Sequence, residues 1–372
     1  MLLKELQRIL FTKNSLVFHG GLKTVERTMR AIRFYEPGVI KLEEVDIPKI
    51  SENEVLIKTK AILTCGTDLK IYRRGHPKIK PPMIFGHEFS GVIAQVGSKV
   101  TKFAEGMRVV AANSAPCNEC YFCKKGKHNL CEELAETLIG FSVDGAYAEY
   151  IRIPERIASQ NMYEIPSHVS FQEAAFTEPL ACVVNGNKIA DINLADNVVI
   201  IGAGPIGLLH IQLALARGAK NVIAIDLIEY RLQKALEVGA HDAINAKTDP
   251  VGKVKKITDG RGADVVIECV GVPQTWENAI AMTGKAGTTI LFGGAAPGTK
   301  ISVDTHRIHY EDLTIKGIFH HTPVCVKRAL DLISSGIVNV KPLITKEMPL
   351  NQVSDALELL QKGENIKIAI IP

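Results

Sequence analysis

The sequence predicts an α/β protein in which a part built mainly of β-strands precedes a doubly wound parallel sheet. In the second half of the chain, apolar strand-like segments alternate strictly with helical segments, the pattern of a parallel sheet covered by crossover helices. In the first half, alternating segments separated by Pro and Gly turns indicate short strands. The chain has 372 residues, more than one hydrophobic core usually takes, so we expect two domains.

The first half of the chain is expected to be mostly β-structure. Residues 1–28 are interpreted as an N-terminal extension that contributes little to an active site. From Met29 the sequence alternates as "MRAIRFYEPGVIKLEEVDIPKISENEVLIKTKAI", and Gly-rich, strand-like sequence continues to about Tyr150. A cysteine-rich stretch interrupts it, and helical periodicity begins over residues 171–188.

The second half of the chain is expected to alternate between strands and helices. The strand "NVVIIGAG" is followed by a helix that ends near Gly218, and "NVIAID" is followed by the helix "EYRLQKALEVGA". Further strands are expected at "HDAIN", "ADVVIECVG" and "GTTILFGG", with a helix near residues 276–282 between the last two. After about residue 318 we expect two short helices, "VKRALDLISSG" and "VSDALELLQKG", and a terminal strand, "IKIAIIP".

The composition is that of an ordinary globular protein and argues against several classes. A net charge of +4 gives no reason to expect nucleic acid or an anionic membrane as a partner. Eight cysteines do not make a disulfide scaffold in a chain of this length, and the N-terminus lacks the pattern of a secretory signal, so a reducing cytoplasm is expected. The apolar segment 198–216 is nearly long enough to span a membrane, but Pro205, His210, Gln212 and its glycines favour a strand, a turn and a buried helix.

The glycine-rich turn that opens the second half predicts a dinucleotide site. Gly202, Gly204 and Gly207 have the G-x-G-x-x-G spacing between a strand and a helix, and Asp226 ends the next strand. These glycines let backbone N–H groups and the helix N-terminus approach a pyrophosphate, whereas a turn without a ligand is the alternative. The Asp226 carboxylate would bind the adenosine ribose and repel a 2′-phosphate, which favours NAD over NADP. The expected cofactor-binding residues are Gly202, Gly204, Pro205, Ile206, Gly207, Asp226 and Arg231.

Four cysteines within residues 117–131 predict a closed metal site. Their spacing, C-x2-C-x2-C-x7-C, supplies four thiolates and leaves no position for water, which suits structural zinc. An iron–sulfur cluster is the rival, but bacterial ferredoxins continue with x3-C-P, whereas here seven residues intervene and Glu132 follows the last cysteine. The predicted ligands are Cys117, Cys120, Cys123 and Cys131.

A second metal site, with an open position, is predicted from residues outside this stretch. Cys65 in "CGTD" and His87 in "GHEFSG" are ligand types that suit zinc. Glu178 in "TEPLACV", at the junction with the nucleotide-binding half, is a candidate third ligand. Each residue alone would be better explained as an ordinary buried side chain. Their occurrence together with a nucleotide fold favours a metal.

These motifs together resemble one enzyme family. "CGTD", "GHEFSG", the four-cysteine stretch, "GAYAEY", "EPLAC", "GAGPIG" and "IKGIF" make the chain from Met29 onward similar to the medium-chain zinc-dependent alcohol dehydrogenases, in their sorbitol and threonine dehydrogenase branch. The resemblance implies a GroES-like catalytic domain over residues 29–182, completed by residues 319–372, with a structural zinc lobe at 117–131. It implies a Rossmann NAD-binding domain over residues 183–318, two zinc ions per chain, and a homotetramer or homodimer.

The resemblance also implies roles for individual residues. Alcohol dehydrogenases hold their catalytic zinc with two cysteines and one histidine. In this branch of the family a glutamate, which Glu178 matches, replaces the second cysteine. Glu88 matches a residue that ligates the zinc directly or through water. Thr67 matches the first proton acceptor beside the substrate hydroxyl, and Asp68 matches a carboxylate that orients His87.

Two positions depart from the family pattern. Lys70 stands where a histidine often relays the proton to solvent, so a lysine would have to take over that step. His320 and His321 follow "KGIF", where sorbitol dehydrogenases have an arginine and an aromatic residue, which argues against sorbitol itself.

We therefore predict an enzyme that oxidises a secondary alcohol, such as a polyol or an L-threonine-like compound, to a ketone by hydride transfer to NAD. The basic stretch "LKIYRRGHPKIK" raises the hypothesis of an anionic substrate such as a polyol phosphate, although such a run is more often a solvated loop. A zinc-free quinone-type reductase would not need Cys65, His87 and Glu88 together. A non-catalytic nucleotide-binding protein on the same fold is the alternative outside enzymes.

Overall fold

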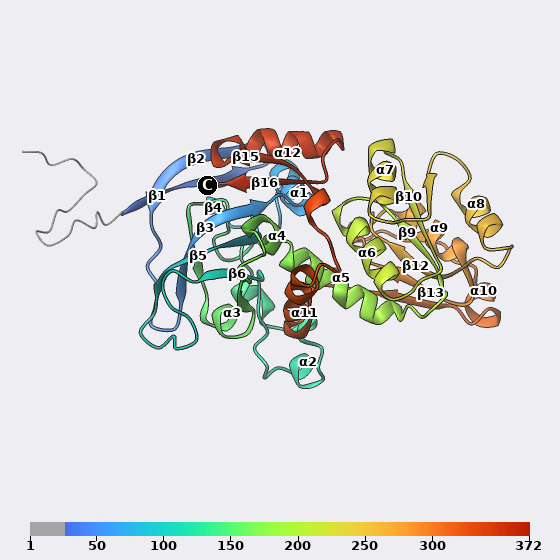
Figure 1. The fold of residues 1–372 in the computed structure, drawn as a ribbon, viewed down its shortest axis with the longest axis horizontal. Coiled ribbons are helices and arrows are strands. Elements are labelled where there is room, and N and C mark those ends of the chain that lie inside the picture. The colour runs from blue at the N-terminus through green and yellow to red at the C-terminus, as the bar shows by residue number, and fades with distance from the viewer. Residues whose placement is uncertain (1–26) are drawn as a thin grey trace, which may run out of the picture.

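The computed structural model describes residues 27–372, which form two lobes on either side of the helix α5 (Thr177–Ala190) (Figure 1). The predicted N-terminal extension falls outside the described residues except for its last two. Thr28, one of these two, is already the first residue of strand β1 (Thr28–Glu36).

The first lobe is mostly antiparallel β-structure. A seven-stranded sheet has the order β15-β16-β3-β5-β6-β8, with β7 paired to β3, and a three-stranded sheet has the order β2-β1-β4. Besides β1, the strands of these sheets are β2 (Val39–Asp46), β3 (Val55–Leu63), β4 (Met83–Ile84), β5 (Glu88–Val96), β6 (Arg108–Ala111), β7 (Tyr150–Ile153), β8 (Met162–Glu164), β15 (Ile344–Pro349) and β16 (Lys367–Ile371).

The end of the chain returns to this first lobe. The predicted terminal strand is β16, and it pairs antiparallel with β3, so that Ala369 lies opposite Leu63 and Ile370 opposite Ile62. Helix α12 (Val353–Lys362) packs beside α1 (Gly66–Arg74) on the same lobe. A side chain on the last strand therefore lies within reach of residues near position 65.

The second lobe is a parallel sheet with the strand order β11-β10-β9-β12-β13-β14. The order reverses between β9 and β12, as in doubly wound sheets, and confirms the predicted fold class. Its strands are β9 (Asn197–Ile201), β10 (Asn221–Asp226), β11 (Asp242–Asn245), β12 (Ala263–Glu268), β13 (Thr283–Leu291) and β14 (Thr314–Gly317). The helices between them are α6 (Pro205–Ala216), α7 (Glu229–Glu237), α8 (Pro250–Ile257), α9 (Pro273–Met282) and α10 (Thr305–Tyr310).

The remaining helices are short and mostly belong to the first lobe. The basic stretch that we interpreted as a solvated loop is helical in its first half, where it forms α1, because a capping box starts the helix and Ile71 is buried. The others are α2 (Tyr121–Lys124), α3 (Glu155–Gln160), α4 (Phe171–Ala175), α11 (Pro323–Ser334), and the 3-10 turns η1 (His128–Leu130), η2 (Leu134–Thr137), η3 (Lys341–Leu343) and η4 (Leu350–Gln352).

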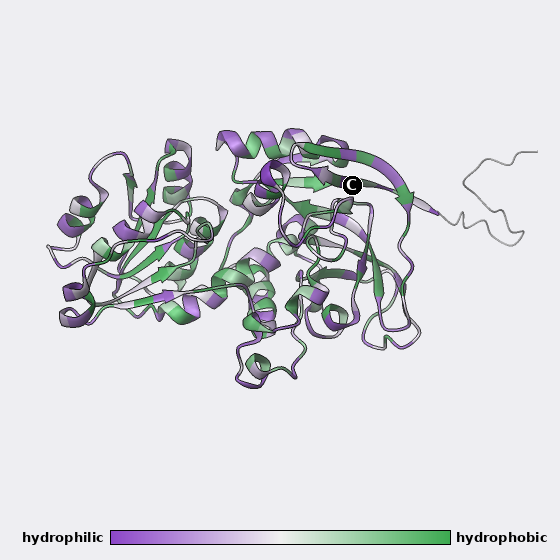
Figure 2. Ribbon diagram, turned by 180° about the vertical axis from the view of Figure 1, so that it is seen from behind, coloured by the Kyte–Doolittle hydropathy of each residue, from purple (hydrophilic) through white to green (hydrophobic). Residues whose placement is uncertain are grey.

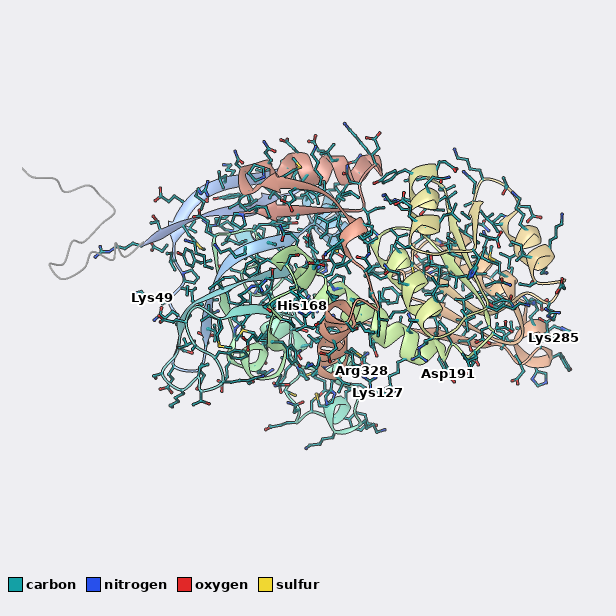
Figure 3. The ribbon with its side chains drawn as sticks, in the orientation of Figure 1. Lys49, Lys127, His168, Asp191, Lys285 and Arg328 are labelled. Atoms are coloured by element: carbon teal, nitrogen blue, oxygen red, sulfur yellow. The ribbon has the colours of Figure 1, made fainter. Side chains whose placement is uncertain are left out.

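Apolar side chains gather inside both lobes, and the hydropathy colouring shows the strands of each sheet as largely hydrophobic (Figure 2). One buried cluster spans α5, α6, α11 and the neighbouring strands, so the helix α5 belongs to the core that joins the lobes. Lys49 and Lys285 lie toward opposite ends of the part of the molecule that the structure describes (Figure 3). Within residues 27–372, no helix combines the length and the apolar composition needed to cross a bilayer.

Candidate active site and metal centres

The N-terminus of α1 fixes three of the predicted site residues. Cys65 is the N-cap, and its Sγ accepts a hydrogen bond from the Thr67 backbone N–H at 3.4 Å. The Asp68 carboxylate accepts one from the Cys65 N–H at 3.0 Å, which completes the capping box. Lys70 lies exposed one turn after Thr67. The sequence "CGTD" thus holds a thiol, a hydroxyl and a carboxylate within one helical turn.

Asp68 is fully buried and links α1 to His87. Its carboxylate accepts a hydrogen bond from the Tyr147 hydroxyl at 2.9 Å and lies 3.1 Å from Nδ1 of His87. Burial lowers the pKa of His87, but the Asp68 carboxylate outweighs it and holds that pKa well above its usual range. Because Nδ1 faces Asp68, Nε2 is the ring nitrogen free to bind a metal.

His87 and Glu88 directly follow a backbone turn at Gly86 that only glycine permits. Gly86 has φ +90°, and a Cβ on it would lie 2.7 Å from the Tyr147 ring. The chain then enters β5, and this brings the ligand atoms of Cys65, His87 and Glu88 within 4.8 Å of one another. A thiol, an imidazole and a carboxyl at this spacing fit a zinc ion.

Glu88 has a partner that the sequence analysis missed. Lys367 on β16 forms a buried ion pair with the Glu88 carboxylate, and both side chains are almost completely inaccessible. Burial raises the pKa of Glu88 while the Lys367 ammonium opposes that rise, and Glu88 in turn keeps Lys367 charged. The single lysine within the apolar stretch "IKIAIIP" was the sequence feature that could have indicated a buried ion pair.

Glu178, the other predicted ligand, starts α5 beside this cluster. Its carboxylate lies within 4.8 Å of both His320 and His321, and 4.0 Å from Nε2 of His321. Burial raises the pKa of Glu178 to about 7, and the nearby charges of His87 and Glu88 act on it in opposite directions. The structure therefore places Glu178 next to the Cys65–His87–Glu88 cluster but groups it more tightly with the two histidines.

His320 and His321 are anchored by the segment that follows β6. Nε2 of His320 lies 2.6 Å from the Ser114 hydroxyl, and Nε2 of His321 lies 3.0 Å from Oδ1 of Asn113. Burial lowers the pKa of His320 to about 4 and that of His321 well below its usual range. The sequence analysis noted both histidines as departures from the family and did not assign them to the site.

The four predicted cysteines of the 117–131 lobe converge. Their sulfur atoms lie within 4.8 Å of one another, and none of the four forms a disulfide. Backbone N–H groups of Glu132 and Cys123 lower the pKa of Cys120 to about 6, whereas burial raises that of Cys123 to about 12. Four thiols at this spacing fit a closed tetrahedral zinc site, in which they supply all four ligands.

The lobe also contacts the active-site region. Nδ2 of Asn129 donates a hydrogen bond to the carbonyl oxygen of Phe319 at 2.9 Å. Phe319 directly precedes the His320–His321 pair, so the position of the lobe bears on the position of those rings.

The glycine-rich turn joins strand β9 to helix α6. Gly202 has φ +94°, and a Cβ on Gly207 would lie 1.8 Å from the Gly202 carbonyl oxygen, so the turn closes only with glycine. Gly204 is the N-cap of α6, Pro205 and Ile206 begin the helix, and no atom lies within 4 Å of a Cβ placed on Gly204. The turn leaves open space at a helix N-terminus, where a phosphate group binds well.

Asp226 lies at the end of β10 beside this turn. It accepts hydrogen bonds from the backbone N–H groups of Ala203 at 2.8 Å and Ile228 at 2.9 Å. A guanidinium nitrogen of Arg231 lies 3.9 Å from its carboxylate. The structure therefore places Arg231, which was predicted as a cofactor-binding residue together with Asp226, beside that carboxylate.

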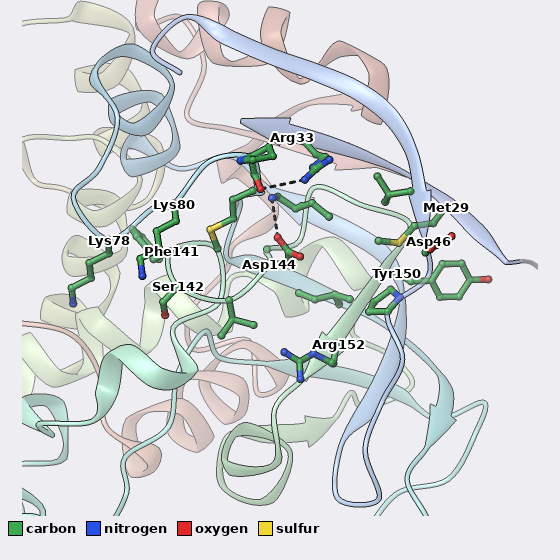
Figure 4. Close-up of a pocket in the computed structure, with 18 residues that line it drawn as sticks. Met29, Arg33, Asp46, Lys78, Lys80, Phe141, Ser142, Asp144, Tyr150 and Arg152 are labelled. Carbon is green, nitrogen blue, oxygen red and sulfur yellow. Dashed lines mark hydrogen bonds between the residues drawn. The ribbon is translucent and has the colours of Figure 1, made fainter. Parts of the chain in front are cut away.

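A cavity of about 590 Å³ lies in the first lobe and is lined by residues such as Arg33, Asp144 and Arg152 (Figure 4). None of the predicted metal or dinucleotide residues lines it. Phe141 stands between the two regions, since it lines the cavity and its ring centroid is 5.4 Å from that of His87. The cationic side chains around the cavity are Arg33, Lys78, Lys80 and Arg152.

Similarity to known proteins identifies the family of this chain. Residues 51–166 match the family model of the alcohol dehydrogenase GroES-like domain, and residues 205–335 match that of the zinc-binding dehydrogenases. The chain belongs to the zinc-dependent alcohol dehydrogenase family. As a member of that family it is a dehydrogenase with zinc and NAD as cofactors, which confirms the predicted class.

Several relatives of this dehydrogenase are similar over almost its whole length. The L-threonine 3-dehydrogenase of Bacillus licheniformis is 37% identical over 91% of this chain and 96% of its own. The sorbitol dehydrogenase of Bacillus subtilis is 34% identical, with coverage of 94% and 99%. The crystal structure of galactitol-1-phosphate dehydrogenase from Escherichia coli superposes with a TM-score of 0.84 at 28% identity, covering 92% of this chain and all of that one.

Proposed function

We propose that this dehydrogenase oxidises a secondary alcohol at the centre formed by Cys65, His87, Glu88 and Glu178, with NAD as hydride acceptor. The observation that carries this assignment is the Cys65–His87–Glu88 cluster, in which His87 and Glu88 are buried and the imidazole is oriented by Asp68. A thiol, an imidazole and carboxylates gathered in this way are the ligand types that zinc takes in proteins. Zinc bound here supplies Lewis-acid activation of the substrate hydroxyl.

The side chains of this chain then have separate tasks. Thr67, half-buried at the start of α1, is the proposed acceptor of the proton from the substrate hydroxyl. Lys70, one turn further along α1 and exposed, is the proposed route of that proton to solvent. Asp68 holds the His87 ring through Nδ1, and the Asn113–His321 and Ser114–His320 contacts fix one wall of the substrate space.

The substrate proposed is a polyol or an L-threonine-like compound, because relatives with these named activities match almost the whole chain. A polyol phosphate is the second candidate. One observation favours it: Lys78, an exposed residue of the basic stretch, lies close enough for its charge to lower the pKa of His320, after the larger effects of burial and of His87.

The experiment that tests the proposal measures NADH formation with a panel of polyols, polyol phosphates and L-threonine. Saturable turnover with one class of secondary alcohol, lost after removal of zinc by a chelator and restored by zinc, is the expected result. NADH binding without turnover of any alcohol would instead indicate the non-catalytic alternative.

A homotetramer or homodimer is proposed for the assembly, and the cytoplasm for its location. The sheet of the second lobe ends in the edge strand β14, and an unpaired edge can pair with a second copy. All eight cysteines are free of disulfides in the structure, which suits a reducing compartment. Light scattering of the purified chain would give the number of copies.

Asp226→Ala is expected to reduce the preference for NAD over NADP by about tenfold or more in kcat/KM. The substitution removes the charge that repels a 2′-phosphate and leaves Arg231, now unpaired, beside that position. The control is Asp264→Ala, since Asp264 lies at the opposite end of the sheet and accepts from the Asn197 N–H. Equal efficiency of the unsubstituted enzyme with both cofactors would contradict the role given to Asp226.

Lys367→Met is expected to lower the free energy of unfolding by about 3 kcal/mol, because it leaves the Glu88 carboxylate buried without its partner. The double variant Lys367→Met/Glu88→Gln removes both charges and should recover most of that loss. Urea unfolding of the metal-free chains measures both effects. A single variant as stable as the unsubstituted chain would show that the ion pair contributes nothing.

A further inference from the structure

A buried carboxylate with no part in the proposed reaction lies at the carboxyl end of a central strand in the second lobe. Glu268 is the last residue of β12, and its side chain is fully inaccessible. β12 lies next to β9 at the point where the strand order reverses, and in doubly wound sheets the dinucleotide lies across the crevice at that point. No lysine, arginine or histidine among the described residues forms an ion pair with it.

Glu268 holds together the two loops on its side of the crevice. Its Oε1 accepts hydrogen bonds from the backbone N–H groups of Val270 and Gly271, both at 2.8 Å, and from the Thr275 hydroxyl at 2.7 Å. Its backbone carbonyl accepts from the N–H groups of Phe292 at 2.9 Å and Gly293 at 2.8 Å. One residue thus fixes the loop after β12 and the loop after β13.

The fit around this carboxylate is tight. A Cβ on Gly293 would lie 2.7 Å from Oε2 of Glu268, and a Cβ on Gly271 would lie 2.6 Å from the Gly294 carbonyl oxygen. Val270 in turn packs on the dinucleotide turn, with its Cγ2 2.8 Å from where a Cβ of Gly202 would be. The loop held by Glu268 therefore forms the wall that faces the glycine-rich turn.

Oε2 of Glu268 is buried and has no hydrogen-bond donor within the part of the chain that the structure describes. A buried polar atom without a hydrogen-bond partner costs stability. The presence of Glu268 at the crevice is explained if the shape that it imposes on the two loops helps to bind the ligand.

The two sides of the crevice face different halves of the dinucleotide. Asp226, on the β9–β10 side, is placed to bind the adenosine ribose, so the β12–β13 side faces the nicotinamide half. We infer that Glu268 is a positioning residue for the nicotinamide half of NAD, acting through the segments 270–275 and 292–294. The inference rests on the binding of NAD and not on which alcohol is oxidised.

The test compares two ligands that share the adenosine half. NADH carries the nicotinamide ring, and ADP-ribose lacks it, so the ratio of their dissociation constants reports on that half alone. Glu268→Gln keeps the shape of the side chain but turns an amide N–H2 toward either the loop N–H groups or Gly293. We expect it to weaken NADH binding by about tenfold and ADP-ribose binding by less than about twofold.

Two further variants make the result decisive. Glu277→Gln on α9, whose carboxylate accepts from the Ser302 N–H at 3.0 Å, is the matched control and should leave both affinities unchanged. Thr275→Val removes one donor to Glu268 and should weaken NADH by about threefold with ADP-ribose unaffected, which also decides the matter if Glu268→Gln does not fold.

Equal weakening of both ligands would show that Glu268 merely supports the fold, and no weakening of either would show that the loops do not need it; either result overturns the inference. Both ligands are measured without alcohol. An enzyme that binds NADH selectively through Glu268 but oxidises no alcohol would overturn the proposed function and leave this inference standing.

Discussion

Cys65→Ser is expected to reduce alcohol oxidation by about a thousandfold or more while the fold and NAD binding survive. The substitution removes the thiolate from the Cys65–His87–Glu88 cluster, and a serine hydroxyl does not replace it as a zinc ligand near neutral pH. The fold should persist because Cys65 is also the N-cap of α1, and serine is among the best N-cap residues.

Steady-state turnover, NADH binding and the melting temperature together test this prediction. Cys325→Ser is the matched control, since it makes the same sulfur-to-oxygen change at a buried cysteine of α11. Near-normal turnover of Cys65→Ser would show that the reaction takes place elsewhere.

Cys120→Ser is expected to act mainly on stability, with a fall in melting temperature on the order of 10 °C. The other three cysteines of the 117–131 lobe cannot complete a closed site, and the binding free energy of that metal is part of the folding free energy. Turnover should fall as a consequence, because Asn129 of the lobe contacts Phe319 beside His320.

Differential scanning calorimetry with parallel activity assays measures both effects. Lys124→Ser, on the short helix that begins directly after Cys120 but not a predicted ligand, should change neither turnover nor melting temperature. Complete loss of turnover in Cys120→Ser with an unchanged melting temperature would mean that the two centres have the opposite roles.

The parts of the site that depend on short sequence spacing were predictable. The turn at Gly202–Gly207 and the four cysteines of the lobe are each contained in a few residues, so the local geometry follows from the spacing. The same holds for Cys65 and Asp68, which one capping box places together. The doubly wound sheet followed from the strand and helix alternation.

Contacts between distant segments were not predictable. Lys367 meets Glu88 across 279 residues, because the last strand of the chain inserts next to β3, and no local pattern encodes that pairing. His320 and His321 meet Ser114 and Asn113 across 206 and 208 residues. Glu178 was predicted to join the metal centre, and only the tertiary packing shows how close it lies to the two histidines.

Short or weakly periodic elements were also missed. The helices α8 and α10 and the edge strand β14 have 8, 6 and 4 residues, too few for a clear apolar period. The basic character of α1 concealed its buried face, which consists of Asp68 and Ile71.

The central claim is that the chain holds two separate zinc ions, one in the closed four-cysteine site and one at the reaction centre. Its most direct test is the zinc content per folded chain, measured by mass spectrometry for the enzyme and for Cys65→Ser and Cys120→Ser. We expect about two zinc ions in the unsubstituted chain and about one in each variant, with the ion that remains differing between them. A single zinc ion in the unsubstituted chain, or loss of the same ion from both variants, would contradict the account.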